Sequence, residues 1–216
     1  MIVAIDGPAG SGKGTITKLV AEKCNLIYID TGATYRCLAL ACIENKIDYK
    51  EENKVVDLLK KINIDFDKNG HAFLNGKDVS ERIRDKDVTS VVSPISSIIK
   101  VREILVDLQR KMALGKNVIM EGRDITTVVF PKADYKFYLD TSVEERANRR
   151  YKQNQEKGIN MSYEEIIESI KARDYNDINK PIGNLKRTND QIYIDSSNMS
   201  INEVVDKIIN EIGSDK

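Results

Sequence analysis

The sequence has almost no histidine and no excess of charge of either sign. The first absence limits which side chains can act as a general base, and the second limits which anionic ligands the protein can bind. Its 216 residues include 34 basic and 34 acidic side chains, so the formal net charge is zero. Such a chain offers no broad positive surface for nucleic acid, and an anionic ligand must meet a local cluster of cations. The single histidine, His71, lies between two turn signals, which argues against a catalytic or zinc-binding role and directs the search for a general base to carboxylates.

Cysteine is also scarce, and no long apolar run is present. The three cysteines, Cys24, Cys37 and Cys42, form no CxxC pair, and two of them lie in apolar helical stretches, so we expect buried, reduced thiols. The longest apolar run falls well short of the roughly 20 residues that a membrane-spanning helix needs. The first residues read as a strand rather than as a charged leader. We therefore expect a cytoplasmic protein.

Five short β-rich runs alternate with helical patterns along the chain. They cover residues 2–6, 26–30, 118–121, 135–140 and 192–195. This alternation predicts an α/β fold with a five-stranded parallel sheet flanked by helices. The length favours a single domain, residues 1–216, with an insertion. Three pairs fit a capping box at a helix start, namely Ser142 with Glu145, Ser162 with Glu165, and Ser200 with Glu203.

Two segments depart from the alternating pattern. Between about residues 61 and 84 the hydrophobic period changes to two, and Asn69-Gly70 and Asn75-Gly76 are strong hairpin turns, which predicts a small antiparallel insertion. Residues 151–162 are polar and contain Gly158, so we predict a mobile flap that joins two helices.

A glycine-rich segment directly follows the first strand and opens a helix. In this context the backbone can wrap the β- and γ-phosphates of a nucleotide, the helix N-terminus favours negative charge, and Lys13 adds a cation. We call residues 7–13 the phosphate loop. The residues predicted to bind ATP are Gly7, Pro8, Ala9, Gly10, Ser11, Gly12, Lys13, Gly14 and Thr15.

The sequence of this loop argues against a dinucleotide-binding motif and against the usual Mg²⁺ ligand of a phosphate loop. A dinucleotide-binding GxGxxG motif fails, because Gly10 and Gly12 would need a third glycine where Thr15 stands. The strict phosphate-loop pattern places Ser or Thr directly after the lysine to hold Mg²⁺, whereas Gly14 follows here. This departure argues against direct ligation of Mg²⁺ by Thr15, and the GKGT form resembles nucleoside monophosphate kinases.

A GTP-binding switch has superficial support in two short matches. Residues 45–48, NKID, match the guanine-reading NKxD, and residues 67–70, DKNG, match DxxG. The order of the two matches is the reverse of that in GTPases, and DKNG falls in a predicted hairpin turn. We therefore disfavour this interpretation.

Further polar residues follow the second and third predicted strands. Thr31, Tyr35 and Arg36 open a helix and form a second anion site, or else a capped helix start with a solvated arginine. Glu121 ends the third strand, where P-loop enzymes place the group that orients Mg²⁺ and its waters. The alternative for Glu121 is a capping or salt-bridging carboxylate.

Three arginines precede the predicted flap. Arg146, Arg149 and Arg150 have the spacing i, i+3 and i+4, so they project from one side of a helix. In isolation such a run is usually a solvated face. Beside a phosphate loop it favours a closing flap whose cations stabilise a phosphoryl group in transfer.

The motifs GPAGSGKGT, DTGATYR, EGRDITTVVFP, ERANRR and RDYND, which together span almost the whole chain, resemble the bacterial cytidylate kinases. The resemblance implies an adenylate-kinase-like P-loop core, an acceptor-binding region at about residues 31–115 that includes the insertion, and a helical lid at about residues 146–175. It implies transfer of the γ-phosphoryl group of ATP to CMP or dCMP, with Mg²⁺ delivered with ATP.

The same resemblance assigns roles by motif position. Catalytic roles fall to Lys13, Arg123, Asp124, Arg146, Arg149 and Arg150, and CMP binding to Thr31, Tyr35, Arg36, Ser93, Arg102, Arg123, Asp124, Arg173 and Asp177. No protein ligand to a metal is implied beyond Thr15 and Glu121 acting through water. The sequence departs from the family pattern at Asn176, where some members have arginine, and at Lys180, where an arginine often helps to recognise the base. We expect Lys180 to bind CMP in its place, and the alternative is an exposed loop lysine just ahead of Pro181.

Three interpretations therefore remain distinct. The favoured one is a CMP or dCMP kinase that acts as a monomer and binds neither nucleic acid nor membrane. The runner-up is a P-loop kinase of another small acceptor, such as UMP, dephospho-coenzyme A or shikimate. A non-catalytic nucleotide-binding protein is opposed by Lys13 and by the arginines of the predicted lid.

Overall fold

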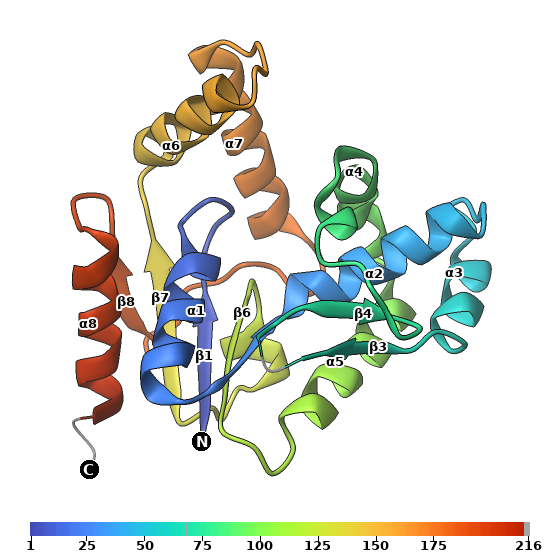
Figure 1. Cartoon of the computed structure of the whole chain (residues 1–216), viewed down its shortest axis with the longest axis horizontal. Coiled ribbons are helices and arrows are strands. Elements are labelled where there is room, and N and C mark those ends of the chain that lie inside the picture. The colour runs from blue at the N-terminus through green and yellow to red at the C-terminus, as the bar shows by residue number, and fades with distance from the viewer. Residues whose placement is uncertain (68, 214–216) are drawn as a thin grey trace.

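A five-stranded parallel sheet forms the centre of the molecule (Figure 1). The computed structural model describes residues 1–67 and 69–213. The strand order is β2-β6-β1-β7-β8. The strands are β1 (Ile2–Asp6), β2 (Ile27–Asp30), β6 (Val118–Gly122), β7 (Tyr135–Asp140) and β8 (Ile192–Asp195). The predicted α/β fold and its five strands are confirmed.

Parallel pairing brings the carboxyl ends of the strands to one edge of the sheet. Asp6 at the end of β1 lies beside Gly122 of β6 and Tyr138 of β7, and Asp30 at the end of β2 lies beside Glu121. The connection from β1 leads to β2 on one side of it, and the connection from β6 crosses to β7 on its other side. Ligands of open α/β sheets bind at such a point, outside the carboxyl ends of the strands.

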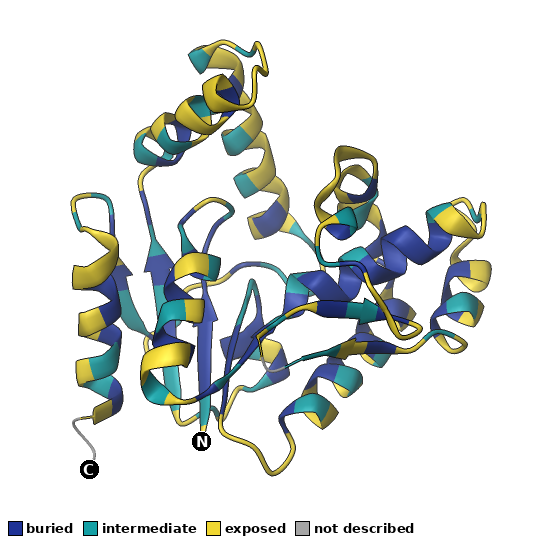
Figure 2. Ribbon diagram, viewed as in Figure 1, coloured by how far each residue is buried: buried dark blue, intermediate teal, exposed yellow. Residues whose placement is uncertain are grey.

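Helices cover both faces of the sheet, and Figure 2 shows the buried central strand β1 beside α1 (Lys13–Cys24) and α8 (Ile201–Gly213), whose outer sides are exposed. On one face α1 and α8 pack on Val3, Ile5 and Phe137. On the other face α5 (Ile99–Ala113) and the short helix η2 (Ile125–Val129) pack on Ala4 and Met120. The alternation of neighbouring strand residues between the two faces is the period of two that a pleated strand imposes.

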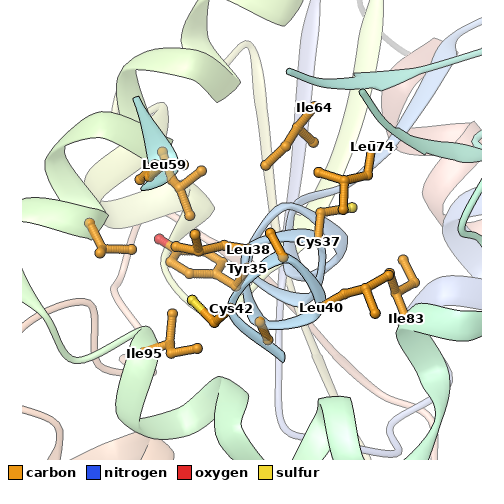
Figure 3. Close-up of a cluster of buried hydrophobic side chains, with 14 of the residues drawn as sticks. Tyr35, Cys37, Leu38, Leu40, Cys42, Leu59, Ile64, Leu74, Ile83 and Ile95 are labelled. Atoms are coloured by element: carbon orange, nitrogen blue, oxygen red, sulfur yellow. The ribbon is translucent and has the colours of Figure 1, made fainter. Parts of the chain in front are cut away.

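The segment between β2 and β6 forms a second lobe, which we call the side lobe. It contains α2 (Thr31–Glu44), α3 (Glu52–Leu59), β3 (Ile64–Phe66), β4 (Ala72–Leu74), β5 (Lys77–Asp78), η1 (Arg82–Arg84), α4 (Lys86–Ile95) and α5. The three short strands pair antiparallel, which confirms the predicted insertion. In Figure 3 the side chains of Leu38, Leu40 and Cys42 on α2 lie at the centre of the lobe's apolar cluster.

The cysteines are free thiols, as predicted. Cys37 and Cys42 are buried in the side lobe, and burial raises the pKa of Cys37 to about 12 and that of Cys42 to about 11. Cys24 is only half-buried, which corrects the expectation that all three would be buried. It stands near the end of α1.

Two helices, α6 (Val143–Glu156) and α7 (Tyr163–Asn179), extend beyond the carboxyl edge of the sheet and form what we call the arm (Figure 1). The predicted flap of residues 151–162 is too long, because α6 continues to Glu156. Residues 151–156 are polar but mostly tolerant of helix, and buried Asn154 lies against Met161. The loop that joins the helices is thus residues 157–162, with Gly158 at φ 66°.

Of the three predicted capping boxes, two are complete and one is half formed. Ser162 with Glu165 and Ser200 with Glu203 make reciprocal hydrogen bonds. Ser142 accepts from the backbone amide of Glu145, but its own amide donates to Ser197, so that box is half formed.

The segments that resemble GTPase motifs both lie in the side lobe, and neither follows a strand of the central sheet. Asn45 caps the C-terminus of α2, and Lys46 follows it with φ 54°. Asp67 accepts from the amides of Asn69 and His71 in the turn between β3 and β4, and Lys68 of the DKNG match lies outside the described residues. None of the helices in the described part of the chain combines the length and apolar composition that spanning a membrane requires.

Candidate active site

Two adjoining cavities open at the carboxyl edge of the sheet. One, of about 1030 Å³, lies between the sheet and the side lobe, and we call it the lobe cavity. The other, of about 1310 Å³, lies under the arm, and we call it the arm cavity. Gly10, Gly12 and Thr15 line both, so the phosphate loop forms their common floor.

The phosphate loop joins β1 to α1 in a shape that depends on glycine. A Cβ atom on Gly7 would lie 2.1 Å from the carbonyl oxygen of Leu139, so no other residue fits against β7. Gly12 caps α1 with φ 86°, a left-handed conformation that favours glycine. The loop therefore places the N-terminus of α1 at the floor of both cavities, where the helix dipole favours an anion.

Lys13 is folded back onto the loop. Its ammonium donates to the carbonyl oxygens of Gly7 at 2.8 Å and Pro8 at 2.7 Å, and to the hydroxyl of Ser11 at 3.3 Å. Burial, with Arg123 as a second cause, lowers the pKa of Lys13 to about 7. Phosphate oxygens reaching this ammonium would raise the pKa again, because an opposite charge favours the protonated form.

Asp6, which the sequence analysis did not select, lies directly before the phosphate loop at the end of β1 and binds η2. It is fully buried and accepts from the amides of Ile125 and Thr126 at 2.8 and 2.9 Å, and from the Thr126 hydroxyl at 2.6 Å. Burial raises the pKa of its carboxyl group above the ordinary value. The residue ties the phosphate loop to η2, directly after Asp124. An acidic residue at the end of an otherwise apolar strand was the available signal.

Glu121 lies beside the start of α1, and its carboxylate is oriented by Tyr28. The Tyr28 hydroxyl donates to Oε1 of Glu121 at 2.6 Å. A Cβ atom on Gly14 would lie 3.0 Å from the same oxygen. A serine or threonine after Lys13 would therefore crowd this carboxylate, which gives a physical reason for the glycine found there. Burial and the charge of Asp30 raise the pKa of Glu121.

The residues around Glu121 fit a divalent cation that is bound together with nucleotide phosphates. Among the described residues, no group of three or more His, Cys, Asp or Glu side chains could hold a metal ion. Mg²⁺ is usually bound through one or two carboxylates together with substrate phosphates. Glu121 offers such a carboxylate beside the phosphate loop, and Thr15 is exposed at the floor of both cavities.

The base of the lobe cavity holds a buried ion pair between Arg102 of α5 and Asp124. Burial raises the pKa of Asp124 to about 6, against the opposing charge of Arg102. The guanidinium carbon of Arg102 lies 5.7 Å from the centre of the Tyr35 ring. Gly183 packs so closely on this guanidinium that a Cβ there would lie 1.9 Å from Nη2. The sequence analysis missed Gly183, which has no local motif.

A second pair joins Arg123 to Asp177 near the end of α7, with Nε and Oδ2 2.8 Å apart. Burial opposes ionisation of Asp177, yet Arg123 holds its pKa below the ordinary value. Lys180 lies 3.7 Å from the same carboxylate and donates to the Ser96 hydroxyl at 3.1 Å. Burial lowers the pKa of Lys180. Lys180 thus lies in the cavity rather than in an exposed loop, and Ser96 is a neighbour that the sequence analysis missed.

The remaining predicted acceptor residues line the same cavity. They are Thr31, Arg36, Ser93 and Arg173. Thr31 donates to the backbone oxygen of Glu121 at 2.7 Å, and Arg36 is paired with Asp30 at 2.6 Å. His71 also reaches this cavity, where its ring nitrogen lies 2.8 Å from Asp67.

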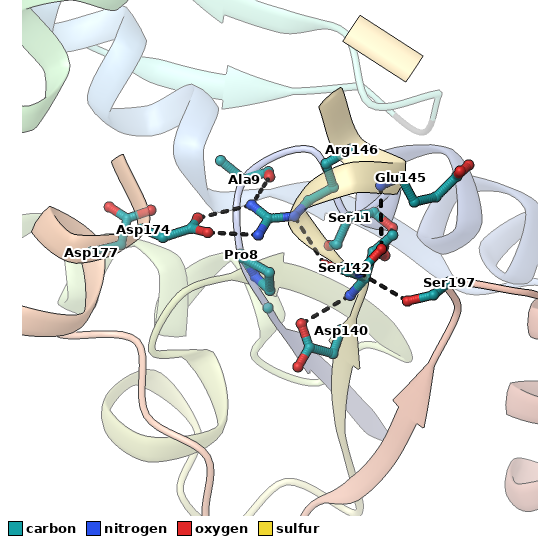
Figure 4. Close-up of polar contacts among 12 residues, drawn as sticks. Pro8, Ala9, Ser11, Asp140, Ser142, Glu145, Arg146, Asp174, Asp177 and Ser197 are labelled. Atoms are coloured by element: carbon teal, nitrogen blue, oxygen red, sulfur yellow. Dashed lines mark hydrogen bonds and ion pairs between the residues drawn. The ribbon is translucent and has the colours of Figure 1, made fainter. Parts of the chain in front are cut away.

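The three arginines of α6 line the arm cavity but differ in their surroundings. Figure 4 shows the guanidinium of Arg146 between the Ala9 carbonyl, at 3.0 Å, and Asp174, which takes two bonds of 2.9 and 2.6 Å. Its Nε donates to the Thr141 carbonyl. Arg149 is paired with Glu145, and Arg150 is exposed. Arg146 therefore links both helices of the arm to the phosphate loop.

Comparison with known proteins identifies the family. A family model described as cytidylate kinase matches residues 3–214. The chain belongs to the cytidylate kinase family. It is 46% identical over 212 residues to the cytidylate kinase of Fusobacterium nucleatum subsp. nucleatum, covering 98% of this chain and 97% of the relative. It is 43% identical to that of Clostridioides difficile, covering 98% of each chain.

Solved structures support the fold of this cytidylate kinase family member. A protein of Eubacterium ventriosum described as uncharacterized matches with a TM-score of 0.55 at 14% identity, covering 99% of each chain. The Thermus thermophilus protein TT1252 matches with a TM-score of 0.50 at 17% identity, covering 100% of this chain and 97% of the other. At these identities the likeness concerns the fold alone.

One wall of the arm cavity was missed by the sequence analysis. The segment after β8 contributes Ser196, Met199, Ser200 and Ile201. Its only sequence signal was the capping box of Ser200 with Glu203, which marks the start of α8. In this member of the cytidylate kinase family that helix start lies at the same edge of the sheet as the phosphate loop.

Proposed function

We propose that the protein transfers the γ-phosphoryl group of ATP to CMP or dCMP. The observation that carries the proposal is the pair of cavities that meet over the phosphate loop, one under the arginines of the arm and one lined by the predicted CMP-binding residues. Two nucleotides bound in these cavities would bring their phosphates together above Gly12. Membership of the cytidylate kinase family supports this choice of donor and acceptor.

On the donor side, the amides of the phosphate loop and Lys13 would hold the β- and γ-phosphates. Mg²⁺ would arrive with ATP, with Glu121 and Thr15 contacting it through water, and when bound it supplies charge neutralisation at the transferred group. Arg149 and Arg150 would turn toward the phosphates when the arm closes. Arg146 already donates hydrogen bonds to Thr141, Ala9 and Asp174, so it would keep the phosphate loop and the arm in a fixed relative position.

On the acceptor side, Arg36, Arg123 and Arg173 would bind the CMP phosphate together with Thr31 and Tyr35. Ser93, Arg102, Asp124, Asp177 and Lys180 would recognise the base and the sugar. The ion pairs of Arg102 with Asp124 and of Arg123 with Asp177 support these assignments, because they fix planar donors and acceptors within one cavity. Selective recognition of cytosine needs such polar groups, which an incorrect base would leave unpaired.

We further propose that the enzyme acts in the cytoplasm as a monomer, without nucleic acid or membrane as a partner. The balanced charge of the chain supports the absence of a nucleic-acid partner.

Release of ADP across a panel of acceptors tests the function. CMP, dCMP, UMP, dephospho-coenzyme A and shikimate would each be offered with ATP and Mg²⁺, and kcat/KM compared. We expect CMP or dCMP to give the highest value. A higher value for any other acceptor would replace the proposed substrate, and ADP release independent of every acceptor would reject the transfer reaction.

A further inference from the structure

The boundary between the two cavities is formed by a small set of residues. Besides the phosphate loop and Thr15, the side chains that line both cavities are Arg84, Thr89, Ser169 and Arg173. A phosphoryl group that moves from the arm cavity to the lobe cavity must cross this boundary. Its two arginines are therefore placed where charge on the moving group is met, and of these only Arg173 has been given a role above.

Arg84 reaches the boundary from the side lobe. It ends the short helix η1, which is fixed by Ile83, with 1% of its surface exposed, and by a hydrogen bond of 2.9 Å from the Arg84 amide to the Glu81 carbonyl. The backbone of Arg84 is thus held firmly beside the cavity. Its long side chain, by contrast, is 65% exposed.

The ion pair that Arg84 makes is a weak one. Its Nη2 lies 3.5 Å from Oδ2 of Asp30. The same oxygen is bonded to Arg36 at 2.6 Å, and Oδ1 accepts from the amide of Ala33. An ion pair at this distance, with one partner largely exposed, contributes little to stability. Arg84 can therefore leave Asp30 for a phosphate without leaving that carboxylate unpaired.

The same turn contains a second arginine, Arg82, that can be compared with Arg84. Arg82 lies two residues earlier and is bound by both carboxylate oxygens of Asp87, at 2.7 and 2.6 Å, and by Asp85 at 3.1 Å. It lines neither of the two cavities. One turn of η1 thus presents one arginine to surface carboxylates and the other to the cavity boundary.

We propose that Arg84 is a catalytic residue that contacts the phosphoryl group in transfer. The inference rests on the proposed phosphotransfer. An oxygen of the acceptor phosphate, which is largely a dianion at neutral pH, donates its electron pair to the γ-phosphorus. The bond from this phosphorus to the β,γ-bridging oxygen breaks, and the electron pair remains on the β-phosphate of ADP. No proton is moved, and Arg84 acts as a permanent positive charge against the charge on the equatorial oxygens.

This role differs from binding of the acceptor alone. Because Arg84 faces both cavities, it would lie opposite the arginines of the arm when the arm closes over the phosphate loop. Cations on opposite sides of the moving group stabilise charge that is greatest in the transition state, and such contacts raise kcat more than they lower KM.

Single-turnover kinetics of Arg84→Gln test the proposal, with Arg82→Gln as the matched control. We expect Arg84→Gln to lower the rate of the chemical step by at least about a hundredfold, with both KM values within about threefold of wild type. Arg82→Gln should keep the wild-type rate. A bisubstrate analogue, adenosine and cytidine joined by five phosphates, should bind Arg84→Gln at least about tenfold more weakly, while ATP and CMP alone bind as before.

Three results would overturn the proposal. These are an unchanged rate in Arg84→Gln, an equal loss in both variants, or a raised KM for CMP with an unchanged rate, which would indicate ground-state binding only. Failure of the proposed acceptor is recognised separately, because wild type and Arg82→Gln would then both fail to phosphorylate CMP. In that case the two variants are compared with the acceptor that the wild-type enzyme does use.

Discussion

The phosphate loop and the lobe cavity hold their charges in different ways. In the loop, Lys13 is bound by carbonyl oxygens five and six residues away, and backbone amides supply the rest of the site. In the lobe cavity, each of three arginines is held by a carboxylate, in the pairs Arg36 with Asp30, Arg102 with Asp124, and Arg123 with Asp177. The loop carries net positive character from its backbone and one lysine, whereas these three arginines of the lobe cavity already have carboxylate partners.

This difference assigns different tasks to the two regions. A site of backbone donors binds phosphate whatever nucleoside carries it, so the loop provides affinity and transition-state stabilisation. A cavity of paired side chains accepts a ligand only when the ligand satisfies the groups that it separates or covers, so the lobe cavity provides selectivity. Substitutions in the loop should therefore lower turnover, and substitutions in the lobe cavity away from its boundary with the arm cavity should alter KM for one substrate.

The largest effect is expected in the phosphate loop. Lys13→Met should lower kcat by at least about a hundredfold, because one preorganised donor facing transition-state charge contributes about 3 kcal/mol. Far-UV circular dichroism should be unchanged, since the lysine bonds only to its own loop. Steady-state kinetics make the measurement, and Lys23→Met, an exposed lysine paired with Asp206, is the control. Unchanged turnover in Lys13→Met would remove the loop from the mechanism.

A smaller and more selective effect is expected at Lys180. Lys180→Ala should raise KM for CMP by about tenfold or more, the loss expected for a charge-assisted hydrogen bond, and leave KM for ATP nearly fixed. Lys180→Arg should retain CMP binding and sharpen discrimination against UMP, because the planar guanidinium offers a second donor. Lys171→Ala, an exposed lysine of α7, is the control. Unchanged KM values throughout would mean that the base is read without Lys180.

Closure of the arm should depend on both regions together. Trypsin cleavage after Lys157, in the loop that joins α6 and α7, should be slower with CMP and ATP together than with either nucleotide alone, because closure needs anions on both sides of the arm's arginines. Mass spectrometry of the fragments makes the measurement. Cleavage after Lys116, an exposed residue at the opposite edge of the sheet, should not respond. Equal rates at Lys157 under all conditions would argue against a closing arm.

The smallest effect is an uptake of protons. Because the pKa of Lys13 is lowered to about 7, most of the lysine is neutral at about pH 8, and a bound phosphate should restore its proton. Calorimetry of ATP binding in buffers of different ionisation enthalpy should show uptake approaching one proton at that pH and declining as the pH falls. Lys13→Arg, which stays charged, should show none of this uptake. Equal uptake in both proteins would assign the proton to another group.

The same contrast explains how far the sequence could predict the structure. The strands, the glycine-rich turn between β1 and α1, and two of the three capping boxes follow from patterns within a few residues, and the structure contains them. The partners in the lobe cavity were not predictable, because Arg102 and Asp124 are 22 residues apart and Lys180 and Ser96 are 84 apart. Gly183 is needed only because Arg102 packs against it.

Two local features also went unrecognised. The polar composition of residues 151–156 favoured a loop, whereas continuation of α6 satisfies their backbone groups. From the sequence, Asp6 at the end of the first strand could be exposed in a turn or buried and hydrogen-bonded. Its hydrogen bonds from the amides of Ile125 and Thr126, which only the fold brings close, distinguish the two. The family resemblance supplied the roles of individual side chains, which remain proposals.

A crystal structure of the protein with CMP tests the account most directly. We predict that CMP occupies the lobe cavity, with its phosphate within hydrogen-bonding distance of Arg36, Arg123 and Arg173 and its ring beside Asp124 and Lys180. CMP bound under the arm, or with its phosphate in the phosphate loop, would contradict the division of the site into a donor and an acceptor side.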